Sequence, residues 1–136
     1  MEVLTTANSM MDLSEIRKQA QDEAWVTILH PVSGEETSMR IRLLSPDSER
    51  YRQIDNRIRN AATKSMTKRG GLSAEELSES GLQLLIQATV GWENVIFDGQ
   101  PIQFSPENVR TVYTDFPFIR EQVDRFLGDR RNFFLN

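Results

Sequence analysis

Side chains that could perform acid–base or nucleophilic chemistry are sparse in this sequence of 136 residues. Carboxylates occur as adjacent pairs at Asp22/Glu23, Glu35/Glu36 and Glu75/Glu76, but adjacent side chains on a strand or a helix diverge instead of facing one substrate. The chain has no cysteine, which excludes thiolate nucleophiles, and its single histidine, His30, lies beside a predicted turn. We therefore predict a protein that is not an enzyme, with no catalytic residue, cofactor or metal site.

Basic residues concentrate in the middle of the chain. Residues 40–69 carry nine Arg and Lys against three acids, a local charge of +6, whereas residues 1–39 and 70–136 each carry −5. Two interpretations fit this pattern: a basic helix with surface ion pairs, or a patch for an acidic partner that includes Arg52, Arg57 and Arg59. Nucleic acid is disfavoured as that partner because the sequence pI is about 5.1 and nucleic-acid-binding domains are usually strongly basic.

The elements that would position these residues follow from hydrophobic periodicity, which predicts an α+β fold that is mainly α. An N-terminal β-hairpin, with strands at 24–30 and 39–43, is expected to pack against about four helices. Its apolar face would carry Val26, Ile28, Met39, Ile41 and Leu43, and Arg40 and Arg42 would face water or a partner. We predict an N-terminal arm at 1–24 that is partly disordered, a single helical domain with the hairpin at 25–128, and a C-terminal tail at 129–136. No apolar run reaches the roughly 18 residues that cross a bilayer, so no membrane contact is expected.

Capping residues, prolines and glycines mark the predicted helices. Ser45 with Pro46 is expected to start an Arg-rich helix, and Ser73 with Glu76 fits a capping box. The predicted helices span residues 12–21, 46–69, 74–90, 106–114 and 117–127.

The stretch from Gly91 to Asn108 predicts a rigid corner between two helices. Trp92 would close one apolar helical face as Gly91 weakens the helix. That face would consist of Leu77, Leu84, Leu85, Ala88 and Trp92. Gly99 would supply a turn, and Ser105 with Pro106 would cap the next helix. We therefore predict structural roles for Trp92, Gly99, Ser105 and Pro106.

The C-terminal tail is more apolar than a solvated segment requires. Phe133 and Phe134 follow Arg130 and Arg131 in the last residues of the chain. Both phenylalanines are candidates for partner binding, and packing onto the domain is an equally good interpretation.

The order and spacing of several motifs resemble the tail assembly chaperones of long-tailed bacteriophages and related prophages. These motifs are SPDSERYR at 45–52, GWENV at 91–95, DG at 98–99, FSPEN at 104–108 and FIREQV at 118–123. The resemblance covers about residues 25–134. It implies a chaperone in the host bacterial cytoplasm that binds and solubilises the tape measure protein, promotes assembly of the tail tube around it, and is absent from the mature virion.

The resemblance also implies further partners. These are the tail tube protein and a longer product of the same gene made by ribosomal frameshifting, and self-association is left open. The alternative to a chaperone is a small DNA-binding or regulatory phage protein that uses the Arg-rich helix at 46–69.

Overall fold

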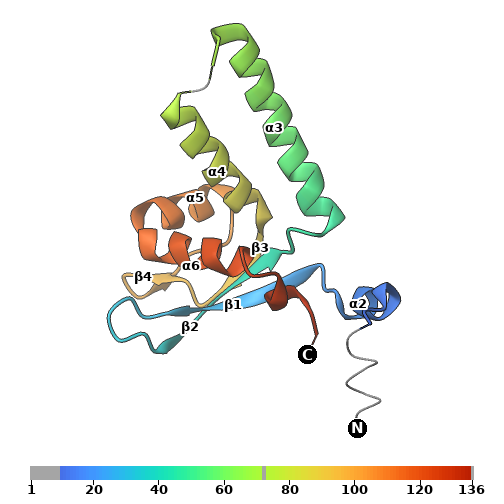
Figure 1. The fold of residues 1–136 in the computed structure, drawn as a ribbon. Coiled ribbons are helices and arrows are strands. Elements are labelled where there is room, and N and C mark those ends of the chain that lie inside the picture. The colour runs from blue at the N-terminus through green and yellow to red at the C-terminus, as the bar shows by residue number, and fades with distance from the viewer. Residues whose placement is uncertain (1–9, 72, 136) are drawn as a thin grey trace.

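A three-stranded antiparallel sheet forms the base of the molecule in the computed structural model, which describes residues 10–71 and 73–135 (Figure 1). The strands lie in the order β1 (Glu23–Leu29), β2 (Glu36–Leu44) and β3 (Thr89–Glu93). Helices α5 (Pro106–Asp115) and α6 (Pro117–Leu127) cover one face of the sheet. The predicted α+β fold, mainly α with an N-terminal β-hairpin, is confirmed.

The core lies between this sheet and the helices above it. Val26 pairs with Ile41 across β1 and β2, and both side chains are buried. Ile28 and Leu43 are buried with them and Met39 packs partly against them, so the predicted apolar face of the hairpin is confirmed. The core residues of α5 and α6 are Val109, Val112, Tyr113, Ile119, Val123 and Leu127.

One polar group in the core is a tyrosine. The hydroxyl of Tyr113 lies 2.6 Å from the hydroxyl of Thr89, which in turn donates to the carbonyl of Leu85 at 2.7 Å. Burial raises the pKa of Tyr113 well above its usual range, although its hydrogen bond with Thr89 opposes the shift. The phenol therefore stays neutral and hydrogen-bonded.

The third strand was not expected, and it corrects the prediction for Trp92. Helix α4 (Ala74–Ala88) ends before Val90, and Trp92 lies on β3 opposite Ile41. Pairing with β2 outweighs the helical periodicity of this segment. The β-branched residues Thr89 and Val90 favour the extended conformation of β3, which completes the sheet. The predicted helical face is therefore wrong at Trp92 and at Leu77, which is 58% exposed. The buried residues of α4 are Leu82, Leu85, Ile86 and Ala88.

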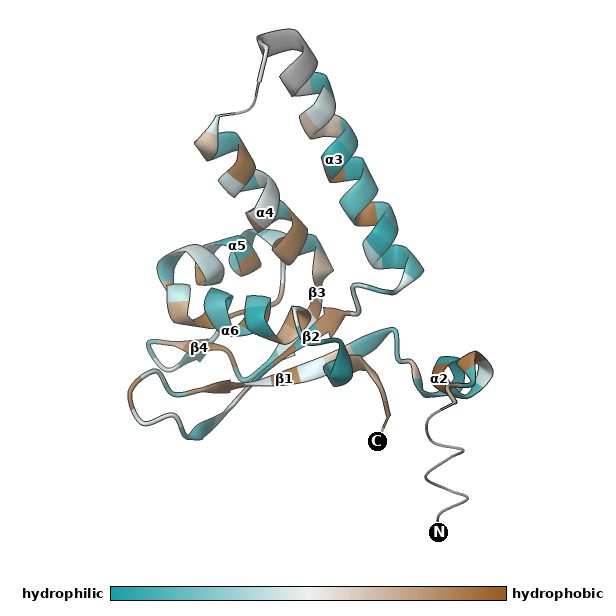
Figure 2. Cartoon of the chain, viewed as in Figure 1, coloured by the Kyte–Doolittle hydropathy of each residue, from teal (hydrophilic) through white to brown (hydrophobic). Residues whose placement is uncertain are grey.

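Helices α3 (Glu49–Arg69) and α4 project from the body as a helical hairpin (Figure 1). Helix α3 begins three residues later than predicted because Ser45 and Pro46 form a turn instead of a cap. The hydroxyl of Ser48 donates to the carbonyl of Ser45 at 2.6 Å and accepts from the amide of Tyr51 at 3.2 Å, so Ser48 is the capping residue. Figure 2 shows hydrophilic residues along most of α3.

The loop between α3 and α4 follows the predicted signals. Gly70 and Gly71 have positive φ angles of 77° and 154°, which side chains disfavour. Ser73 and Glu76 form the capping box that was predicted for α4.

A second, small hairpin links the sheet to α5. Strands β4 (Ile96–Phe97) and β5 (Gln100–Pro101) are joined by Asp98 and Gly99, with φ angles of 51° and 75°. Two consecutive positive φ angles are typical of a type I′ hairpin turn, so the predicted turn at Gly99 is confirmed. Ser105 accepts the amide of Asn108 at 3.1 Å, and Pro106 is the first residue of α5, as predicted.

The two ends of the described chain pair with each other. Ala20, just after α2 (Leu13–Gln19), forms a β-bridge with Phe134, which follows the 3-10 helix η1 (Arg130–Phe133). The amide of Gln21 also donates to the carbonyl of Phe133 at 2.7 Å. Part of the predicted arm and part of the predicted tail are therefore ordered against one another. Residues 1–9 of the predicted arm, on which part of the predicted disorder falls, lie outside the described residues.

The outer edge of β1 is occupied by a side chain. The side-chain amide of Gln122 on α6 accepts from the backbone amide of Leu29 at 2.8 Å and donates to its carbonyl at 2.9 Å. This pair of hydrogen bonds satisfies the backbone of Leu29 on the side away from β2.

Candidate protein-binding surface

Large apolar side chains are exposed together at the β4–β5 hairpin. Ile96 and Phe97 are 56% and 55% exposed, and the Phe97 ring centroid lies 6.3 Å from that of Phe116. We use the name hairpin patch for the group of five residues Met39, Ile96, Phe97, Phe116 and Phe118. Contiguous exposed apolar surface is typical of a protein-binding site in a water-soluble domain.

Two hollows flank the hairpin patch. One of about 230 Å³ is lined by all five patch residues. A second, of about 450 Å³, shares Met39, Ile96 and Phe118 with the first and extends to the turn of the β1–β2 hairpin. The patch is therefore a hollowed surface that can receive apolar side chains.

The base of the hairpin patch is held firmly by backbone hydrogen bonds. The amide of Ile102 donates to the carbonyl of Val95 at 2.7 Å, and Val95 is only 4% exposed. Asn94, with φ of 60°, donates from its side chain to the carbonyl of Ser38 at 2.8 Å. These contacts tie the small hairpin to the sheet, so its exposed residues need little ordering on binding a partner.

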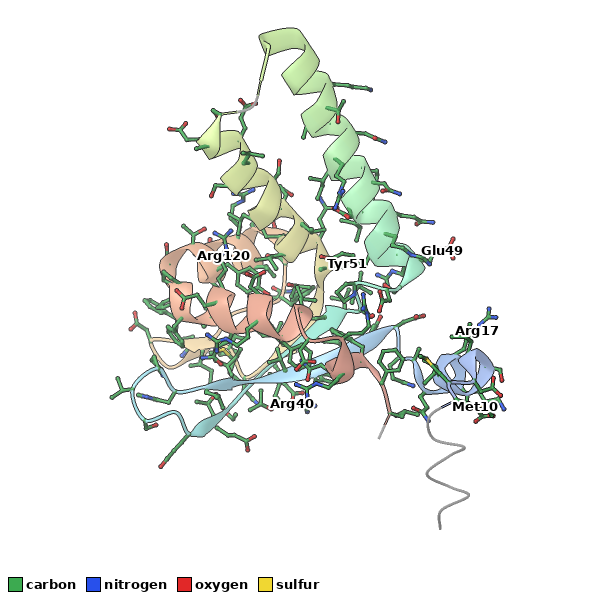
Figure 3. The ribbon with its side chains drawn as sticks, viewed as in Figure 1. Met10, Arg17, Arg40, Glu49, Tyr51 and Arg120 are labelled. Carbon is green, nitrogen blue, oxygen red and sulfur yellow. The ribbon has the colours of Figure 1, made fainter. Side chains whose placement is uncertain are left out.

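The outer face of the sheet is more polar. Trp25 is 37% exposed, and the guanidinium carbons of Arg40 and Arg42 lie 4.7 and 5.9 Å from its ring centroid. Arg40 pairs with Glu93 at 2.9 Å, and Arg42 pairs with Glu23. Figure 3 shows Arg40 on the side of the sheet away from α5 and α6. Both arginines thus have partners within the chain.

The three arginines predicted to form one patch do not share a face of α3. At about 100° per residue, Arg57 lies about 140° around the helix from Arg52 and about 160° from Arg59. Arg59 donates to Asp55 at 3.1 Å on its own helix. Arg57 instead lines a groove between α3 and α4. Arg52 and Arg59 lie only about 20° apart around α3, so for these two residues the patch for an acidic partner stays a prediction, and Arg57 is separate from them.

The two candidate tail residues are placed differently. Phe133 is 1% exposed and packs edge-on against Phe126, with ring centroids 5.4 Å apart. Phe134 is half-buried beside Ala20. Of the two interpretations for Phe133, the structure shows packing onto the domain.

Trp92 anchors the segment that leads into α5. Its indole N–H donates to the carbonyl of Ile102 at 3.0 Å, and its ring meets Phe104 edge-on at 5.4 Å. Sequence reasoning placed Trp92 on a helix and named no residue of the β4–β5 hairpin as a candidate for partner binding, so it missed the hairpin patch. The dipeptide Asp98-Gly99 was the signal that could have revealed the hairpin patch. It is typical of a two-residue hairpin loop, in which the side chains of the two flanking strands lie on shared faces.

His30 shapes the turn of the β1–β2 hairpin. Its Nδ1 accepts from the amides of Val32 at 3.1 Å and Ser33 at 3.3 Å.

Replacing His30 with alanine is expected to lower the free energy of unfolding by about 1 kcal/mol or less, because both hydrogen bonds are exposed to water. Thermal unfolding and a binding assay would check this. Loss of partner binding at unchanged stability would contradict it and give His30 a direct role.

Neither membrane nor metal features mark another site within the described residues. None of the helices in 10–71 and 73–135 combines the length and apolarity that crossing a bilayer requires. Over the same residues, no three His, Asp or Glu side chains gather where they could hold a metal ion.

Comparison with family models, curated proteins and solved structures finds no match to this chain.

Proposed function

We propose that this protein is a tail assembly chaperone that binds and solubilises a phage tape measure protein. The resemblance over residues 25–134 supports the identity of the partner, and the hairpin patch supports the mode of binding. The observation that carries the proposal is the joint exposure of Ile96 and Phe97 beside Phe116 on a firmly held hairpin. In this proposal the protein acts in the host cytoplasm, promotes tube assembly, and leaves before the virion is complete.

The size of the hairpin patch suits a reversible role. A chaperone must cover apolar surface on its partner and later be displaced by tube subunits. A few exposed apolar anchors give moderate affinity, since association has to overcome the loss of translational and rotational freedom. Asp98 and Asp115, which adjoin Phe97 and Phe116 in the chain, form no ion pair with a described residue. They would favour partner segments that carry basic residues beside apolar ones.

Introducing charge into the hairpin patch should abolish the chaperone activity. When the protein is produced together with the tape measure protein, the double variant Ile96→Asp/Phe97→Asp is expected to leave the tape measure protein insoluble, as in the absence of the chaperone. Buried carboxylates would have to lose their hydration at the interface. The soluble fraction of the tape measure protein after centrifugation measures the effect.

The matched control is Val32→Asp, which introduces charge at an exposed apolar residue outside the patch; Val32 is 89% exposed. Both variants should remain folded, because substitutions at exposed positions usually change stability by about 0.5 kcal/mol or less. If the double variant is folded and still keeps the tape measure protein soluble, the hairpin patch is not the binding surface.

The alternative function, DNA binding through α3, has weaker support from the charges. Arg50 pairs with Glu23 at 3.2 Å, and Arg59 pairs with Asp55. These pairs reduce the positive field that phosphate contacts require.

A further inference from the structure

A groove runs between α3 and α4, well away from the hairpin patch. Its volume is about 570 Å³, and its lining is drawn from the two projecting helices alone. The lining includes Arg57, Ile58, Ala61 and Ala62 from α3, and Glu75 and Glu79 from α4.

Small side chains make the α3 side of the groove accessible to another backbone. Ala61 is exposed, and Ala62 and Ile58 are half-buried, so this stripe of α3 is only partly covered by its own chain. Helices pack at axis separations of about 8–10 Å, and the smaller values require small residues at the contact. A third helix can therefore approach α3 and α4 closely here.

The two walls of the groove carry opposite charge. Among the described residues, α3 contributes the cation Arg57 to the lining, whereas α4 contributes Glu75, Glu76 and Glu79 and no Lys or Arg. Arg57 forms no ion pair with a described residue, and neither does Glu75. Arg110 donates twice to Glu79, at 3.1 and 2.6 Å, and these bonds lower the pKa of that carboxyl, so it stays ionised. Glu76 is engaged in the capping box.

We propose that the α3–α4 groove binds an amphipathic helix of a partner protein. That helix carries a stripe of small apolar residues, with acidic residues along the flank that faces α3 and basic residues along the flank that faces α4. Docking of such a helix in a groove is a recurrent mode of recognition, and opposite flanks fix its direction. The proposal concerns a second surface and does not depend on what the hairpin patch binds.

Three synthetic helical peptides of 21 residues, the length of α3, test the charge pattern. All share one Ala/Leu stripe, and their flanks are Glu on one side with Lys on the other, Lys on both, or Glu on both. The protein is expected to bind the mixed-flank peptide about tenfold more tightly than either of the others, because each of those places like charges against one wall. Fluorescence anisotropy at low salt measures the affinities. Equal affinities for the three peptides would overturn the proposal.

Two variants and their controls place the peptide in the groove. Arg57→Glu makes both walls acidic and should shift the preference to the peptide with Lys on both flanks. Arg52→Glu removes a cation from another side of α3 and should leave the preference unchanged. Ala62→Trp fills the groove and should weaken binding of the mixed-flank peptide about tenfold or more, while Asn60→Trp, outside the lining, should not.

Two further measurements keep the interpretation unambiguous. Thermal unfolding of each variant confirms that it is folded, and Ile96→Asp/Phe97→Asp should bind the mixed-flank peptide as the unaltered protein does. A folded Ala62→Trp variant that binds as tightly as the unaltered protein would overturn the proposal. So would a dimer in sedimentation that Ala62→Trp dissociates, because a second copy would then occupy the groove.

Discussion

Replacing Phe133 with alanine is expected to lower the free energy of unfolding by about 3–5 kcal/mol. The side chain is 1% exposed and lies in the core cluster beside Phe126. Its removal leaves a cavity beneath η1, and the backbone bond from Gln21 to the Phe133 carbonyl depends on the same packing. A domain has about 5–15 kcal/mol of stability in all, so urea unfolding should show a large fall in the midpoint.

The control for Phe133 is its neighbour Leu135, which is 57% exposed. Leu135→Ala should change the free energy of unfolding by about 0.5 kcal/mol or less. A Phe133→Ala variant as stable as the unaltered protein would mean that the tail does not pack on the domain in solution. The interpretation of Phe133 as a residue that docks into a partner would then be restored.

Replacing Trp92 with alanine should destabilise the protein by about 3 kcal/mol, the low end of the range for removing an aromatic side chain, because Trp92 is partly buried against the core. The indole joins β3 to the segment that precedes α5, through the hydrogen bond to Ile102 and the edge-on contact with Phe104. Because Ile41 pairs with Trp92 across the sheet, the loss would loosen β3 as well. The melting temperature and the urea midpoint should both fall, and amide hydrogen exchange in β3 should become faster.

Trp92→Phe separates the two contributions of the indole. It keeps an aromatic ring against Phe104 but loses the N–H donor, and leaving the Ile102 carbonyl without that donor should cost about 1 kcal/mol. If Trp92→Ala abolished partner binding while the melting temperature stayed the same, Trp92 would belong to an interface instead.

Local signals allowed much of the fold to be predicted from the sequence. The alternation in β1 and β2, the capping box at Ser73 and the Ser105-Pro106 start of α5 each depend on residues a few positions apart. Strand β3 does not, because its conformation is fixed by pairing with β2 about 50 positions earlier in the chain. Read by itself, the segment from Thr89 to Trp92 continues the apolar pattern of α4, so the periodicity predicted a helix.

The candidate surfaces were harder to predict, since exposure depends on the whole fold. Phe97 and Phe133 are both phenylalanines near turns, yet one is 55% exposed and the other 1%. Asp98-Gly99 predicts a hairpin around Phe97, but whether the ring is exposed depends on what packs against that hairpin. Likewise, helical geometry alone separates Arg57 from Arg52 around α3, but only the position of α4 makes Arg57 part of a groove.

The Gln122 side chain at the edge of β1 has a consequence for aggregation through the edge of the sheet. An open edge strand invites another extended chain to add to the sheet, and that addition can propagate into fibres. Gln122 occupies both backbone groups of Leu29 that such a chain would use. At Leu29, the last residue of β1, an added strand would therefore have to displace the Gln122 side chain before it could pair with this edge.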